Sequence, residues 1–175
     1  MANFDYAVDA TLKNEGGEKY TEINGDSGGA TKFGISLSWY RGKVDPRATR
    51  DTIKALTEDN AKSLYKKYFW DDPKIFMISN QAIASKIFDI GVNTGPSQSI
   101  KLAQRALFSL YGLNCVNDDG VLGQLTISKI NSVETDRNAY LCSLKTAYAD
   151  FYRMLASKES NNRQFLNGWL KRAYD

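Results

Sequence analysis

The 175-residue sequence contains no histidine, and this absence bears on several classes of hydrolase at once. Ser-His-Asp triads, Cys-His pairs and zinc sites built on imidazole all require a histidine. We therefore expect neither an amidase nor an endopeptidase that uses these chemistries. No metal and no other cofactor is predicted.

Cysteine and long apolar runs are also scarce. Cys115 and Cys142 have neither metal-site spacing nor a Cys-x-x-Cys arrangement, so we expect free, reduced thiols and synthesis in the cytoplasm. No run of about 20 apolar residues predicts a membrane span. The first residues lack the basic region and apolar run of a secretory signal.

The composition is that of a folded protein of one domain, with 42% hydrophobic and 12% aromatic residues. The net charge is +3, and the 23 basic residues are interleaved with 20 acidic ones. A nucleic-acid-binding surface would concentrate its lysine and arginine residues, so we predict no nucleic-acid partner.

Residues 4–15 are predicted to form an amphipathic helix that ends in a glutamate, Glu15. Asn3 is a suitable N-cap, and Gly16 and Gly17 provide the usual helix stop. The helix dipole at this end, together with partial burial, would favour the protonated form of Glu15. A general acid needs that form near neutral pH. The apolar face of the helix consists of Phe4, Ala7, Val8, Thr11 and Leu12.

A hairpin is predicted directly after this helix. Residues 20–23 and 31–36 are compatible with strands, and the turn-forming residues 24–29 separate them. The hairpin carries Asp26 and Thr31 and would face the helix end. Individually, Asp26 is also explained by an Asx turn, Thr31 by a strand and Glu15 by a solvated helix end.

As an ordered set these three residues suit glycoside hydrolysis. That reaction needs one carboxyl group that protonates the leaving oxygen, and a second polar group that manages water or positive charge across the sugar.

Most of the remaining chain is predicted to be helical. Thr57 is a good N-cap for a helix that ends near Trp70, and residues 81–92 are apolar on several sides, as in a buried central helix. Further helices are predicted over residues 97–111, after Gly123, over 134–156 and over 163–173.

The segment Glu15-Gly16-Gly17, followed by Asp26-Ser27-Gly28-Gly29-Ala30-Thr31-Lys32-Phe33-Gly34-Ile35-Ser36, resembles the N-terminal signature of the glycoside hydrolase family 108 muramidases. The spacing differs slightly from that of their relatives, the phage-type lysozymes. A second block resembles the region that these proteins carry as a predicted peptidoglycan-binding segment. It comprises residues 88–96, 102–107 and 119–126. The same block is also explained structurally, with Asp119-Gly120 as a turn and Gly95-Pro96 as a helix start.

The resemblance implies a mainly α, lysozyme-like fold with a small β-hairpin beside the active-site cleft. Residues 1–72 would form the muramidase lobe and residues 73–175 a helical lobe, packed together as one globular domain. The implied activity is hydrolysis of the β-1,4 bond between N-acetylmuramic acid and N-acetylglucosamine in bacterial peptidoglycan. Glu15 would be the general acid, Asp26 and Thr31 would stabilise positive charge or hold the attacking water, and Tyr20, Trp39 and Asn93 would contact the substrate.

The resemblance to endolysins further implies a monomer that leaves the cytoplasm through a holin-formed lesion, acts in the periplasm and lyses the cell. Two other functions remain open from the residues. A lytic transglycosylase would use one acidic residue and the 6-hydroxyl group of muramic acid, and the presence of Asp26 and Thr31 argues against it. A non-catalytic peptidoglycan-binding or spanin-like accessory protein would bind the wall without releasing reducing sugar.

Overall fold

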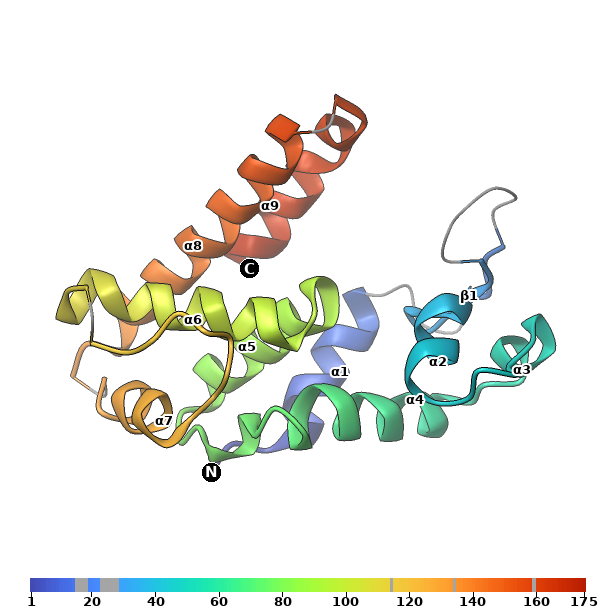
Figure 1. Cartoon of the computed structure of the whole chain (residues 1–175), viewed down its shortest axis with the longest axis horizontal. Helices are drawn as coiled ribbons and strands as arrows, with labels where there is room; N and C mark the ends of the chain where they lie inside the picture. The colour runs from blue at the N-terminus through green and yellow to red at the C-terminus, as the bar shows by residue number, and fades with distance from the viewer. Residues whose placement is uncertain (15–18, 23–28, 114, 134, 159) are drawn as a thin grey trace.

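The computed structural model describes residues 1–14, 19–22, 29–113, 115–133, 135–158 and 160–175. These residues are mainly helical, as predicted, and carry a small two-stranded antiparallel sheet (Figure 1). The α-helices are α1 (Phe4–Asn14), α2 (Leu37–Lys43), α3 (Arg50–Lys54), α4 (Glu58–Tyr65), α5 (Gln81–Thr94), α6 (Pro96–Tyr111), α7 (Gln124–Asn131), α8 (Arg137–Lys158) and α9 (Leu166–Tyr174). The strands are β1 (Thr31–Lys32) and β2 (Ile35–Ser36). Shorter helical segments are the π-helix η1 (Lys66–Asp71) and the 3-10 helices η2 (Ile75–Met77) and η3 (Ser160–Phe165).

The predicted helix boundaries agree closely with the structure. Thr57 caps α4 as predicted, and Asn60 completes a capping box with it. The helix expected to end near Trp70 leaves α-helical geometry after Tyr65 and continues as the π-helix η1 to Asp71. Gly112, with a φ of 80°, ends α6 where the sequence places its stop. The short helices α2 and α3 were not predicted.

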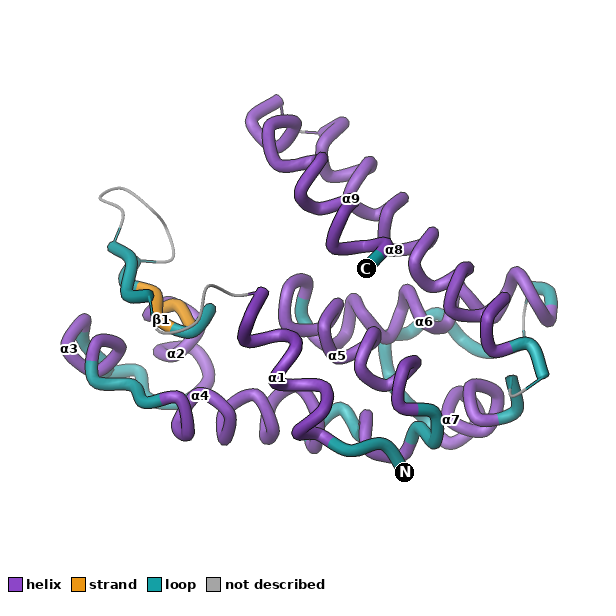
Figure 2. Tube along the Cα trace, turned by 180° about the vertical axis from the view of Figure 1, so that it is seen from behind, coloured by secondary structure: helices purple, strands orange, loops and turns teal. Residues whose placement is uncertain are grey.

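Helix α5 is the centre of the fold. It packs against α1 and η1 on one side and against α6 on another, while α8 and α9 form an antiparallel pair that extends beyond α6 (Figure 2). Its side chains Ile83, Ile87, Phe88 and Ile90 are all fully buried. This confirms the prediction of a buried central helix.

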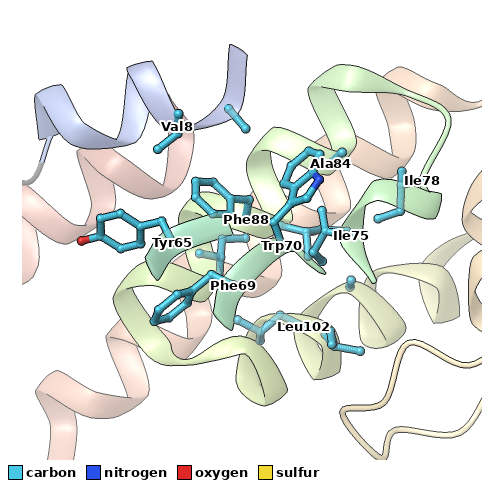
Figure 3. Packing of buried hydrophobic residues seen from close by; sticks show 14 of the residues in the cluster. Val8, Tyr65, Phe69, Trp70, Ile75, Ile78, Ala84, Phe88 and Leu102 are labelled. Atoms are coloured by element: carbon cyan, nitrogen blue, oxygen red, sulfur yellow. The ribbon is translucent and has the colours of Figure 1, made fainter. Parts of the chain in front are cut away.

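Aromatic rings hold α1, η1 and α5 together (Figure 3). The Phe88 ring makes edge-to-face contacts with Phe4 at 5.8 Å and with Trp70 at 5.7 Å between ring centroids. Tyr65 packs edge-on against the same ring at 6.3 Å. Such pairs each contribute about 0.5–1.5 kcal/mol beyond the area that they bury. They fix the direction of α1, and therefore the position of its end.

Cys115 is half-buried, Cys142 is exposed, and no disulfide joins them. No described helix combines the length and the apolar composition that a membrane span requires.

Candidate active site

The carboxyl end of α1 is the predicted place of the catalytic acid. The Asn3 side chain accepts a hydrogen bond from the Asp5 backbone at 2.8 Å, which confirms the predicted N-cap. The predicted apolar face, formed by Phe4, Ala7, Val8, Thr11 and Leu12, is buried. The helix ends at Asn14, and Glu15 is the next residue in the chain. Glu15 and Asp26 themselves lie outside the described residues.

The end of α1 lies between two structural features. The β1–β2 hairpin is on one side and the α8–α9 pair is on the other, an arrangement seen from both faces of the molecule (Figures 1 and 2). The hairpin therefore stands beside the helix end, as the sequence analysis predicted.

The hairpin differs in detail from the prediction. Residues 31–36 were expected to be one strand, but Phe33 and Gly34 form a tight turn between β1 and β2, with Thr31 opposite Ser36. Both turn residues have positive φ angles, 53° and 75°, as a type I′ turn requires. The predicted pairing with residues 20–23 is present as a bridge, in which the backbones of Thr21 and Thr31 exchange hydrogen bonds of 2.8 and 2.9 Å.

Thr31 is thus held by backbone bonds on both edges. Its side chain is half-buried, and its hydroxyl group makes no hydrogen bond with a described residue.

Two long side chains, Tyr65 and Lys32, connect this hairpin to α4 and to the end of α3. The buried Tyr65 hydroxyl donates to the Phe33 carbonyl at 2.7 Å. Lys32 Nζ donates to the carbonyls of Lys54 and Leu56, at 2.9 and 2.7 Å. A two-stranded hairpin is marginal by itself, so these contacts supply the support that it needs.

Trp39, a predicted substrate contact, is half-buried beside the hairpin. Its ring stacks on Phe69 at 5.6 Å and makes an edge-on contact with Tyr68 at 5.3 Å. It lines a cavity of about 150 Å³ together with Gly34, Ile35, Ser36, Leu64, Tyr65, Phe69 and Val92. The cavity joins the hairpin to α5, and it places Trp39 close to the carboxyl end of that helix.

Tyr20 is another predicted substrate contact, and its hydroxyl group is already hydrogen-bonded within the protein. It donates to Glu22 Oε2 at 3.0 Å, and Glu22 in turn pairs with Arg50 Nε at 3.0 Å. Partial desolvation and the hydrogen bond to Glu22 raise the pKa of Tyr20. The phenol therefore stays neutral near neutral pH.

Asn93, the third predicted contact, lies at the carboxyl end of α5 and is bound by α8. Its Oδ1 accepts a hydrogen bond from the Tyr152 hydroxyl and a longer one, 3.4 Å, from Tyr148. The two tyrosine hydroxyls also bond to each other. Because the oxygen is held in this way, the Nδ2 donors of Asn93 face away from the tyrosines, and no described residue accepts from them.

Both tyrosines lie on the helix predicted over residues 134–156, where aromatic residues at helical spacing are more often core than binding residues, and both are buried. Sequence analysis missed their polar role. The i, i+4 spacing places both hydroxyl groups close together on one face of the helix. This spacing is the feature of the sequence that could have predicted a shared polar site.

The second motif block contributes a structural turn. Buried Gln104 donates to Asp119 at 2.8 Å and to the Val121 carbonyl at 3.1 Å, and it accepts from the Gly120 backbone at 3.0 Å. The bond from Gln104 is the main reason that the pKa of Asp119 is lowered. Gly120 has a φ of 74°, and an added Cβ would lie 2.7 Å from the Ser97 carbonyl oxygen. The structural explanation of these residues is therefore sufficient.

Among the residues that the structure describes, no group of three or more acidic or cysteine side chains could hold a metal ion. The fold is mainly α and lysozyme-like, with a small β1–β2 hairpin. It brings together the end of α1, this hairpin and Asn93 at the end of α5.

Comparison with known proteins identifies the family. Residues 8–95, half of the chain, match the family model described as Glycosyl hydrolase 108, and the chain belongs to this family. It is accordingly a glycoside hydrolase. Residues 98–174 match a second model, described as Predicted Peptidoglycan domain, so the hydrolase acts on peptidoglycan.

One solved structure that resembles the chain is SagA from Brucella abortus. The two share 22% sequence identity with a TM-score of 0.73, over 98% of this chain and 93% of that one. At this identity the likeness concerns the fold. None of the curated proteins compared with the chain matches it.

Proposed function

We propose that the protein is an N-acetylmuramidase, which hydrolyses the β-1,4 bond between N-acetylmuramic acid and N-acetylglucosamine. The observation that carries this proposal is the end of α1 at Asn14, directly before Glu15, within the region that matches Glycosyl hydrolase 108. The hairpin that bears Thr31 stands beside that end.

In this proposal Glu15 is the general acid. A carboxyl group at the carboxyl end of a helix meets partial negative charge, which favours the protonated form that must donate to the leaving oxygen. Asp26 stabilises positive charge at the anomeric carbon or, with the unbonded Thr31 hydroxyl, holds the attacking water. This division of labour follows the two-carboxylate scheme, for which lysozyme is the general worked example.

Three side chains provide the substrate contacts. The rings of Tyr20 and Trp39 offer flat apolar surfaces to sugar faces. Asn93 offers two amide hydrogens, which suit the acetamido carbonyl or a hydroxyl group of the glycan. The hydrogen bond from Tyr152 fixes the orientation of this amide.

The test is turbidity loss of purified Gram-negative sacculi with wild type and Glu15→Gln. We expect the variant to be about a hundredfold or more slower, the scale for loss of a general acid. Glu58→Gln is the matched control, because Glu58 lies on α4 in a half-exposed pair with Lys62 and should leave the rate unchanged. Equal rates for wild type and Glu15→Gln would refute the assignment.

Mass spectrometry of the products separates hydrolysis from the transglycosylase reaction. A muramidase releases reducing muramic acid ends. A transglycosylase releases anhydromuramic ends that are lighter by one water, and their presence would contradict the proposal. Binding of sacculi without released sugar would instead indicate a non-catalytic wall protein.

We further propose that the protein works as a monomer, is made in the cytoplasm and reaches periplasmic peptidoglycan through a holin-formed lesion, with cell lysis as the result. Expression with and without a holin tests this route. Rapid lysis that needs both the holin and an intact Glu15 would support it, and lysis that is independent of the holin would contradict it.

A further inference from the structure

A further cavity, of about 410 Å³, lies between α2, α3 and α4, on the same side of the molecule as the hairpin (Figure 1). We call it the α2–α4 cavity. Its volume lies within the range of small-ligand sites. Leu64 lines both this cavity and the one beside Trp39, so the two lie next to each other. Of the proposed site residues that the structure describes, none lines the α2–α4 cavity.

Part of the lining is apolar. Leu56, only 6% exposed, and the half-buried Leu64 contribute aliphatic side chains, and the half-buried ring of Tyr40 adds an aromatic surface. The Leu56 carbonyl accepts a hydrogen bond from Lys32 Nζ at 2.7 Å. Because Lys32 belongs to β1, this bond connects the cavity to the strand that carries Thr31.

The polar part of the lining offers hydrogen-bonding groups that no described residue uses. The hydroxyl groups of Tyr40 and Ser63 make no hydrogen bond with a described residue. Asn60 Oδ1 accepts from the Thr57 backbone at 3.2 Å and from the Thr57 hydroxyl at 2.8 Å. Because the capping box holds this oxygen, the Nδ2 hydrogens face away from Thr57, and no described residue accepts them. The cavity therefore presents two hydroxyl groups and one oriented amide.

The chemistry of this lining indicates a neutral ligand. Among the described residues, no charged side chain lines the cavity. Proteins bind carboxylate and phosphate groups chiefly with arginine and lysine, so an anionic ligand does not suit it. A sugar ring combines an apolar face of C–H groups with hydroxyl groups around its edge. An apolar surface with a few oriented polar groups matches both parts of such a ring.

We propose that the α2–α4 cavity binds a neutral sugar unit of a peptidoglycan glycan strand, outside the site at the end of α1. The inference takes peptidoglycan as the substrate, as the two family matches indicate, and does not depend on which bond is cleaved. A second contact with the polymer would raise the effective concentration of the enzyme at the wall. It would therefore act on substrate binding and not on the chemical step.

The experiment is an NMR titration of the ¹⁵N-labelled full chain with tri-N-acetylchitotriose, a neutral sugar probe without peptide. Wild type, Asn60→Asp and Asn80→Asp are compared. Asn60→Asp keeps an oxygen that can accept from Thr57 and removes the amide donors. Asn80→Asp is the matched control, because it introduces the same charge outside the cavity. The Asn80 side chain accepts from the Ile83 backbone at 3.2 Å at the start of α5.

We expect saturable shifts at the backbone amides of Tyr40, Asn60 and Ser63, and a Kd raised about fivefold by Asn60→Asp, the scale for one lost hydrogen bond. Asn80→Asp should bind as wild type does. Absence of saturable shifts at these amides, shifts confined to residues around Trp39 and Asn93, or equal weakening by both variants would overturn the proposal.

Tyr40→Phe is a second variant that should keep the fold, because it removes only a hydroxyl group that no described residue binds. Its Kd for chitotriose should rise about threefold, again on the scale of one hydrogen bond. A wild-type Kd in both Tyr40→Phe and Asn60→Asp would contradict the proposal, since the sugar would then use neither polar group of the cavity.

Hydrolysis rates separate this result from the assignment of the catalytic acid. On sacculi, Asn60→Asp should raise KM and leave kcat unchanged. Glu15→Gln should lower kcat and still bind chitotriose at the α2–α4 cavity with the wild-type Kd. Saturable shifts at the cavity together with an active Glu15→Gln would refute only the catalytic acid. An inactive Glu15→Gln without shifts at the cavity would refute only the sugar site.

Discussion

At the residue scale, the best-defined polar arrangement is the contact of Asn93 with Tyr148 and Tyr152. Both tyrosines are buried, and burial strongly raises the pKa of Tyr148. Tyr148 therefore remains a neutral hydrogen-bond donor throughout the physiological range. An amide oxygen held by a strong donor has one preferred orientation, so the two tyrosines orient the Asn93 side chain, and under the proposed function they would act on the substrate through it.

Removing the Tyr152 hydroxyl group should loosen the Asn93 amide. For Tyr152→Phe we expect kcat/KM on sacculi to fall about tenfold, equal to about 1.4 kcal/mol of transition-state binding. The free energy of unfolding should fall by about 1 kcal/mol, because a part-buried hydrogen bond is lost. Initial rates and urea denaturation measure the two effects.

Tyr140→Phe is the control for this change. Tyr140 lies on the same helix, is fully buried, and donates to the Ala103 carbonyl at 3.0 Å, away from Asn93. Its loss should cost similar stability without changing kcat/KM. If both variants lose activity in proportion to their stability, Tyr152 has no positioning role.

The candidate site residues were predicted from the order and spacing of the motif residues along the chain. Sequence reasoning predicted substrate contacts at Asn93 and Trp39, but it did not predict their partners, because Tyr152 and Phe69 are distant in sequence and reach them only through packing. The same limit applies to Lys86 and Arg172, which meet across 86 positions of the chain. The catalytic roles assigned to Glu15, Asp26 and Thr31 remain predictions, and so do the substrate contacts assigned to Tyr20, Trp39 and Asn93.

At the scale of elements, the hairpin shows what local rules miss. A type I′ turn is normally signalled by Asn-Gly or Asp-Gly, and Phe33-Gly34 lacks that signal. The left-handed conformation of Phe33 is costly for a bulky residue. Burial of its ring and the bond from Tyr65 to its carbonyl compensate, and both are tertiary contacts. The longer helices were predictable because their caps and apolar stripes are local.

Gly34→Ala should destabilise the hairpin, because alanine at a φ of 75° meets a clash between Cβ and backbone that glycine avoids. We expect the free energy of unfolding to fall by about 1–2 kcal/mol. Urea denaturation, with fluorescence of Trp39 as the probe near the hairpin, provides the measurement.

The same substitution at Gly42 should have the opposite sign. Gly42 lies inside α2, is exposed, and has no neighbouring atom within 4 Å of an added Cβ. Alanine there should gain about 0.5–1 kcal/mol from helix propensity. A destabilised Gly42→Ala, or an unaffected Gly34→Ala, would show that the turn geometry does not control stability here.

At the scale of the whole molecule, the two family matches meet at the end of α5 but share one core. The core cluster runs without interruption from Phe4 in α1 to Ala173 in α9. Polar contacts also cross from α5 into the second region: Lys86 and Asp89 contact Arg172, and Asn93 accepts from Tyr148 and Tyr152. Side chains of the peptidoglycan region thus bury part of the surface of the Glycosyl hydrolase 108 region.

Cutting the chain between Gly95 and Pro96 should therefore abolish folding of the first half. In a fragment of residues 1–95, the side of α5 that packs against α6 would face water, and Lys86 and Asp89 would lose their contacts with Arg172 of α9. Thermal unfolding followed by circular dichroism should show no cooperative transition for this fragment. Mixing it with residues 96–175 should restore the transition and the hydrolysis of sacculi. A cooperative transition in fragment 1–95 alone would show instead that the Glycosyl hydrolase 108 region folds as an independent domain and does not need the contacts with residues 96–175.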